Sequence, residues 1–116
     1  MIDPLSDLNL PSALLSQALV VSASGRPQAA WQRSAALELI RELGGRGIAV
    51  LGGDVVRLDG DLPRRTRDNW HAEPAHGEPF DAFAQRSLAE AAAYITAYRE
   101  PGPSHLFVLL LADRLP

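Results

Sequence analysis

The segment 48–58 reads IAVLGGDVVRL, and it limits the possible folds more than any other part of this 116-residue chain. Its β-branched and aliphatic side chains predict a strand. Two consecutive glycines in its middle, Gly52 and Gly53, indicate a bulge or a close approach of another backbone. The Asp59-Gly60 pair directly after it is typical of a hairpin turn. This segment and the one after the turn are therefore expected to form an antiparallel hairpin with an irregularity in its first strand.

The other predicted elements give an order of α-α-β-β-α-β. This pattern indicates an α+β domain, with a small, mostly antiparallel sheet of about three strands and about three helices packed mainly on one side. The length fits a single domain over residues 1–116, with a loose lead-in at 1–10. The expected elements are a helix from Ser12 that ends before Gly25, a helix from Pro27 to about Leu43, a strand at 64–72, a helix from Pro79 to about Tyr98 and an apolar strand at 105–111.

Composition excludes several kinds of chemistry. The chain has no cysteine, which rules out disulfides, thiolate nucleophiles and cysteine-containing zinc sites. All eleven cations are arginine, so a lysine Schiff base and a P-loop lysine are excluded as well. A net charge of −3 does not suggest nucleic-acid or membrane binding. Asp3 and Asp7 replace the positive start that a signal peptide needs, so a cytoplasmic protein is expected.

Two histidine motifs resemble metal or catalytic sites only in part. His71 and Glu73 match half of a zinc-deaminase signature, but its other half requires cysteines. Adding His76 gives H-x-E-x-x-H, yet Pro74 prevents the helix on which zincin histidines lie. We therefore expect no catalytic residues, no metal and no cofactor.

Carboxylates gather along the predicted hairpin at Asp54, Asp59, Asp61 and Asp68. Asp59 and Asp61 flank the turn glycine, where aspartate commonly bonds to local backbone. Asp54 is less ordinary because it follows two glycines within an apolar strand. A buried carboxylate paired with arginine, backbone N–H or an indole N–H would explain it, and partner binding or catalysis are the alternatives.

Arginines and tryptophans allow further predictions. Arg64, Arg65 and Arg67 indicate an exposed edge strand protected by charge. Trp31 is expected to pack in the core. Trp70 could pack in the core or anchor a partner.

Several of these residues together resemble the Immunity protein 40 family, small bacterial proteins encoded beside polymorphic toxins. The resemblance covers roughly residues 28–111. Its most specific parts are the L-G-G-D-V strand and the N-W pair. The residues concerned are Gly52, Gly53, Asp54, Asn69 and Trp70, with Ser87, Ala91, Tyr94, Ile95 and Tyr98 on the following helix.

The resemblance implies a non-catalytic protein that binds and blocks a cognate protein toxin. We expect the interface near the hairpin, where carboxylates and an aromatic side chain suit a hot spot. A rival hypothesis is a small-ligand or enzymatic domain that uses Asp54, His71 and Glu73 around a pocket. A third is an assembly subunit that pairs through its last strand, and the sequence gives no oligomeric state. The expected partner-binding residues are Asp54, Asp59, Asp61, Asp68, Trp70 and Glu73.

Overall fold

A computed structural model describes residues 2–22, 26–99 and 104–114 of the chain. Three helices and five strands form within these residues, in two antiparallel sheets. Along the chain they are α1 (Ser12–Leu15), β1 (Leu19–Val21), β2 (Gln28–Ala30), α2 (Arg33–Leu43), β3 (Ala49–Asp59), β4 (Leu62–His71), α3 (Phe80–Ala97) and β5 (His105–Ala112).

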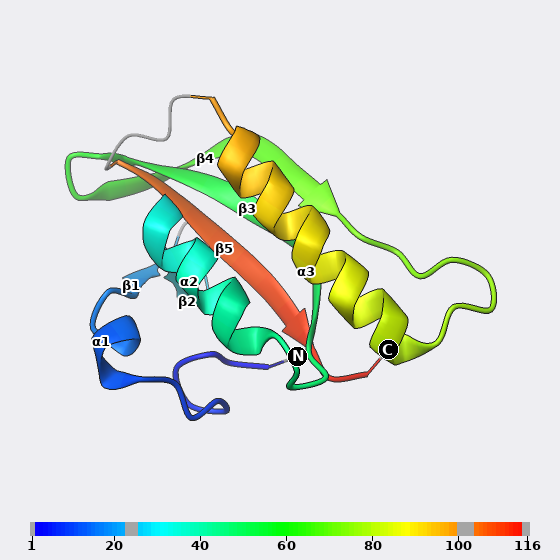
Figure 1. Cartoon of the computed structure of the whole chain (residues 1–116). Helices are drawn as coiled ribbons and strands as arrows, with labels where there is room; N and C mark the ends of the chain where they lie inside the picture. The colour runs from blue at the N-terminus through cyan, green and yellow to red at the C-terminus, as the bar shows by residue number, and fades with distance from the viewer. Residues whose placement is uncertain (1, 23–25, 100–103, 115–116) are drawn as a thin grey trace.

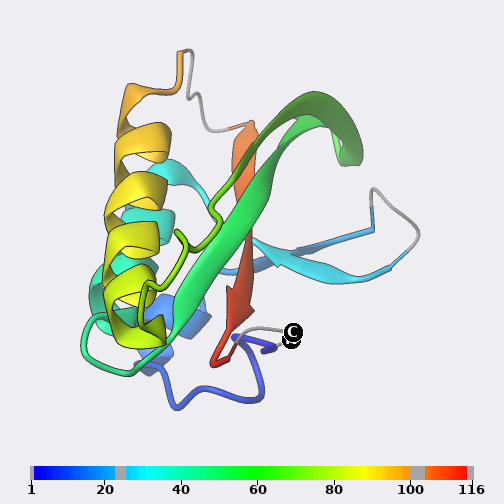
Figure 2. The same ribbon diagram turned by 90° about the vertical axis from the view of Figure 1, so that its right-hand side faces the viewer.

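The larger sheet has the strand order β4-β3-β5, with β3 in the centre. Helices α2 and α3 lie side by side over one face of this sheet (Figure 1). The β1–β2 hairpin lies on the opposite side, as Figure 2 shows. The predicted α+β class and the predicted order of the helices and of the three strands in the larger sheet are confirmed.

The predicted N-terminal half is wrong in part, because it lacks the β1–β2 hairpin that the structure has there. The helix expected from Ser12 has only four residues, and its predicted end at Gly25 lies outside the described residues. The helix expected from Pro27 begins instead at Arg33, because residues 28–30 pair with β1. The aliphatic, β-branched run at 19–21 suits a strand, and the chain after β2 bonds to the large sheet through Trp31.

A continuous apolar run such as that of β5 predicts a strand that is central or covered on both faces. Strand β5 is an outer strand of the ladder, but both of its faces are covered. Phe107 and Leu109 pack in the main core under the helices, while Leu106 and Val108 pack against β1 and β2. The bridge between Trp31 and Phe107 closes part of its outer edge.

The main core lies between the sheet and the two long helices. Trp31, Phe83 and Phe107 are completely buried, which confirms the packing role predicted for Trp31. A smaller cluster on the other face joins the two sheets through Val21, Val56 and their neighbours. Among the described residues, no helix is both long and apolar enough to cross a membrane.

Candidate functional site

The two glycines of β3 make room for Trp70 of β4. Gly53 lies opposite Trp70, and a Cβ atom on Gly53 would come within 2.3 Å of the indole and 2.4 Å of the Val108 carbonyl oxygen. Gly52 has a φ of +153°, and a Cβ there would lie 2.3 Å from the Trp70 carbonyl oxygen. The register also shifts between Val50 and Gly52. The predicted bulge and close backbone approach are both confirmed.

Trp70 belongs to a row of aromatic side chains under α3. Its ring stacks on Tyr94 at a centroid distance of 4.6 Å. Tyr94 is 6.1 Å from Tyr98, whose ring meets Phe107 edge-on at 5.6 Å. Because only 9% of Trp70 is exposed, the structure gives it a packing role in the chain as described.

Ser87 is a buried polar residue that the sequence analysis placed only within the family pattern. Its hydroxyl accepts a hydrogen bond from the Val50 N–H at 2.9 Å and donates one to the Ala84 carbonyl at 2.8 Å. Val50 lies at the β3 bulge, so Ser87 bonds α3 to the strand where the ladder is irregular. A single hydroxyl within the apolar stripe of α3 is the sequence signal for this contact.

A second irregularity lies in β4. Asp54 pairs with Asn69 and Val56 pairs with Arg65. Residues 66–68 of β4 therefore lie opposite the single residue Val55. The Thr66 hydroxyl donates to the Val55 carbonyl at 2.9 Å and accepts from the Asp68 N–H at 3.1 Å. Arg67 takes a left-handed backbone with φ of 72°, unusual for a residue other than glycine.

This β4 bulge directs Asp68 toward α3. The Tyr98 hydroxyl donates a hydrogen bond of 2.7 Å to its carboxylate. Burial raises the pKa of Tyr98 to about 12, with further contributions from the Asp68 hydrogen bond and charge. The pKa of Tyr94 is raised for the same two kinds of reason, burial first and the Asp68 charge second.

Asp54 faces away from the helices. Side chains alternate along a strand, and Gly53 faces the Trp70 indole, so Asp54 lies on the other face beside Asn69 and Val108. It is half-buried there. We call this side of the sheet, not covered by α2 and α3, the open face.

The remaining predicted carboxylates lie elsewhere. Asp59 accepts a hydrogen bond from Arg64 at 3.0 Å near the exposed hairpin turn, and Asp61 follows the turn glycine. Glu73 is exposed in the loop after β4. The structure thus divides the predicted set among the open face (Asp54), the hairpin turn (Asp59 and Asp61), the α3 side (Asp68 and Trp70) and a loop (Glu73).

Arginines are exposed along the edge strand β4, and another arginine, on α3, binds the loop that follows this strand. Arg64, Arg65 and Arg67 are exposed on β4, which confirms the predicted charged edge. In the loop, Arg86 of α3 binds the Glu78 carboxylate at 2.8 and 3.0 Å and the Glu73 carbonyl at 2.7 Å.

Arg86 also binds Glu90, one helical turn away. The Arg86 hydrogen bond lowers the pKa of Glu78 to about 2, and the Ala75 backbone N–H adds to this effect. The pKa of Arg86 is raised in turn, mainly by its hydrogen bond with Glu78. This network was not predicted from the sequence, although the Arg86–Glu90 spacing of four residues is a signal for part of it.

Of the three residues in the rival hypothesis, two lie on one face of the sheet and the third lies in a loop. The register places Asp54 and His71 on the same open face, with His71 opposite Gly52, while Glu73 lies beyond the end of β4. Asp54, His71 and Glu73 do not line the three cavities described within residues 2–22, 26–99 and 104–114. Within the described ranges, no group of three metal-ligating side chains could hold a metal ion.

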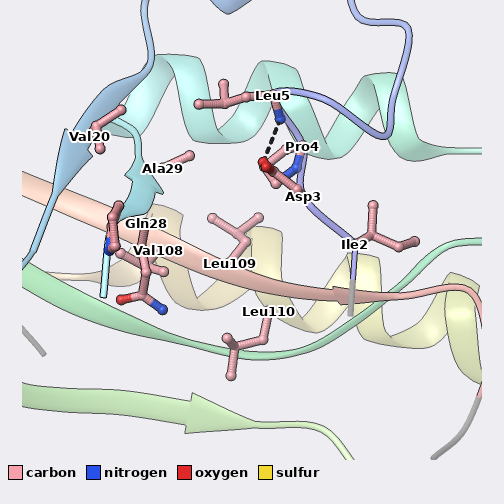
Figure 3. Close-up of a pocket in the computed structure, with 11 residues that line it drawn as sticks. Ile2, Asp3, Pro4, Leu5, Val20, Gln28, Ala29, Val108, Leu109 and Leu110 are labelled. Atoms are coloured by element: carbon pink, nitrogen blue, oxygen red, sulfur yellow. Dashed lines mark hydrogen bonds between the residues drawn. The ribbon is translucent and has the colours of Figure 1, made fainter. Parts of the chain in front are cut away.

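A separate cavity lies between the N-terminal segment, the β1–β2 hairpin and β5 (Figure 3). Its volume is about 440 Å³. Most of its walls are aliphatic, so it offers shape and apolar contact rather than a set of reactive groups.

Comparison with known proteins identifies a family for the chain. No curated protein and no solved structure matches the chain. A family model described as Immunity protein 40 matches residues 21–112, which is most of the sequence. The chain therefore belongs to the Immunity protein 40 family.

Proposed function

We propose that this protein is a non-enzymatic inhibitor that binds a cognate bacterial toxin in the cytoplasm and blocks it. The observation that carries the proposal is the family match over residues 21–112. The site geometry is compatible with it, because the family-pattern residues Gly53, Trp70 and Ser87 pack and bond within the fold. An inhibitor needs a stable scaffold and an exposed contact surface rather than reactive groups.

The contact surface we propose includes the exposed carboxylates around the β3–β4 hairpin. Asp59 and Asp61 lie at its turn, Asp54 lies on the adjoining open face, and Glu73 follows β4. Such a surface suits a toxin whose own functional groove is basic, because complementary charge speeds association. Trp70 and Asp68 would support the surface indirectly, by fixing β4 against α3.

Co-expression with the toxin encoded by the neighbouring reading frame tests the proposal. We expect the cells to survive and a stable complex to elute on gel filtration. Continued cell death together with the absence of a complex would contradict the proposed function.

A pair of matched double variants tests the surface itself. Asp54→Asn with Asp61→Asn removes two carboxylates near the hairpin, and Glu38→Gln with Asp81→Asn removes two on the helices. We expect the first pair to weaken toxin binding about tenfold, with a smaller dependence on salt, because rim charges act on association. Equal binding by both pairs would place the interface away from the hairpin carboxylates.

A further inference from the structure

The outer edge of β5 is bonded at two places and unpaired between them. Trp31 and Phe107 exchange both backbone hydrogen bonds, at 2.9 and 2.7 Å, and the Ile2 N–H donates to the Leu111 carbonyl at 3.1 Å. Along a strand, every second residue directs its N–H and C=O to the same edge. Leu109 therefore directs both of its backbone groups to the edge that carries these bonds.

Within the described part of the chain, the backbone bridges to this edge are at Phe107 and Leu111, and none is formed at Leu109. Leu109 as a whole residue is only 7% exposed, and buried backbone polar groups normally have hydrogen bonds. The unpaired groups lie on the 440 Å³ cavity, whose walls include Val108, Leu109 and Leu110.

The cavity beside Leu109 is lined by apolar side chains from three separate segments. Figure 3 shows Val20 and Ala29 of the β1–β2 hairpin on one side, Ile2 of the N-terminal segment on the other, and Leu109 between them. The apolar wall also extends outward at Val20, which is 63% exposed. A partner that entered the cavity would cover this side chain as well.

We infer that this edge takes a short extended segment of the toxin, which pairs with Leu109 and places an apolar side chain in the cavity. The inference rests on the proposed function and gives it a second contact site. From Phe107 to Leu111 the strand advances four residues, roughly 13 Å, which leaves room for about three extended residues.

The backbone of a peptide explains the site better than an apolar small molecule does. An extended residue opposite Leu109 supplies one N–H and one C=O at the spacing that the unpaired edge requires. Main-chain bonds of this kind give affinity, and the pocket beside them selects the side chain. The apolar walls predict an aliphatic side chain on the toxin segment.

Amide hydrogen exchange measured by NMR tests the pairing directly. Without toxin, the Leu109 amide is expected to exchange faster than those of Val108 and Leu110, which point toward β3. In the complex we expect exchange at Leu109 to slow at least tenfold. Equal protection of the three amides in the toxin-free protein would overturn the inference.

A charge placed at the mouth of the cavity gives an independent test. Val20→Glu adds a carboxylate at an exposed position of the cavity wall, and Ala93→Glu adds the same charge on the exposed face of α3 as a control. We expect Val20→Glu to weaken toxin binding at least tenfold and Ala93→Glu to leave it unchanged.

The outcomes separate this inference from the proposed function. If the wild type binds toxin, but Leu109 exchange and the affinity of Val20→Glu are unchanged, the inference fails and the proposed function stands. If the wild type forms no complex with the toxin, the proposed function fails and the inference fails with it. Protection of Leu109 that rises with protein concentration alone, with dimers in sedimentation, would assign the edge to a second copy and overturn the inference.

Discussion

The two faces of the β4-β3-β5 sheet differ in what their side chains do. On the α3 side, Trp70 covers Gly53 and stacks on Tyr94, and Ser87 bonds to the β3 backbone. On the open face, Asp54 is half-buried beside Asn69, and its register neighbour Val108 lines the apolar cavity. The first face is occupied by contacts with the helices, while the second is covered by the β1–β2 hairpin over β5 and leaves Asp54 half-buried and Asn69 exposed.

The residues of the family motif have two different roles on these two faces. Most of its residues in this chain act as packing, which explains how a short pattern can indicate a fold and a family together. Asp54 and Asn69 are the exception, because strand alternation directs them to the open face. A motif read along the sequence thus contains both scaffold residues and two residues that a partner could reach.

The largest expected effect comes from removing the indole. Trp70→Ala should lower the free energy of unfolding by about 3–5 kcal/mol, because it leaves a cavity over Gly53 and beside Tyr94. Urea unfolding measures the change. Trp70→Phe keeps an aromatic ring and should lower the free energy of unfolding by less. Wild-type stability with lost toxin binding would break the comparison, since Trp70 would then be a contact residue.

A smaller loss is expected at Ser87. Ser87→Ala removes the acceptor of the Val50 N–H and leaves that group buried, at a cost of roughly 1–3 kcal/mol. Ser34→Ala, at an exposed position of α2, is the matched control and should change stability by less than about 0.5 kcal/mol. Equal effects in urea unfolding would show that the Ser87 bond does not hold α3 to the β3 bulge.

The elements that the sequence predicted well have strong local signals. Apolar periodicity, the Asp59-Gly60 turn and Pro79 place β3, β4, α3 and β5 within a few residues of their observed bounds. Strands β1 and β2 have three residues each, too few for a periodic pattern. Their pairing depends on contacts distant in sequence, such as the bridge between Trp31 and Phe107, which local propensity does not predict.

The predicted binding residues were harder to place for a geometric reason. The sequence brings Asp54 and Asp68 near each other on paired strands. The β4 bulge adds residues opposite Val55, so strand alternation does not continue through it. Asp68 turns toward Tyr98 while Asp54 faces the opposite side, and only the three-dimensional register shows this.

The tyrosines give a pH-dependent prediction for the α3 side. The chain has two tyrosines, so their titration by tyrosinate absorbance can be separated with Tyr98→Phe. Tyr98 should ionise near pH 12, against an ordinary value of 10. Because the folded state retains this proton longer, its contribution to stability is complete below pH 10 and is lost as the pH rises toward 12. Ionisation of both tyrosines near pH 10 would contradict the packed aromatic row.

The smallest expected effect lies in the loop that joins β4 to α3. Glu78 has a lowered pKa of about 2, so its contribution to stability is present above pH 4.5 and is lost as the pH falls from 4.5 toward 2. Glu78→Gln should lower stability at neutral pH only slightly, because the ion pair with Arg86 is near the surface, and should flatten the acid dependence. Acid titration followed by circular dichroism measures this, with Glu38→Gln on exposed α2 surface as the control. If both variants lost their folded structure over the same acid range, the Arg86 network would position the loop without adding to the stability of the fold. The α3 side would then contribute to stability only through its buried contacts.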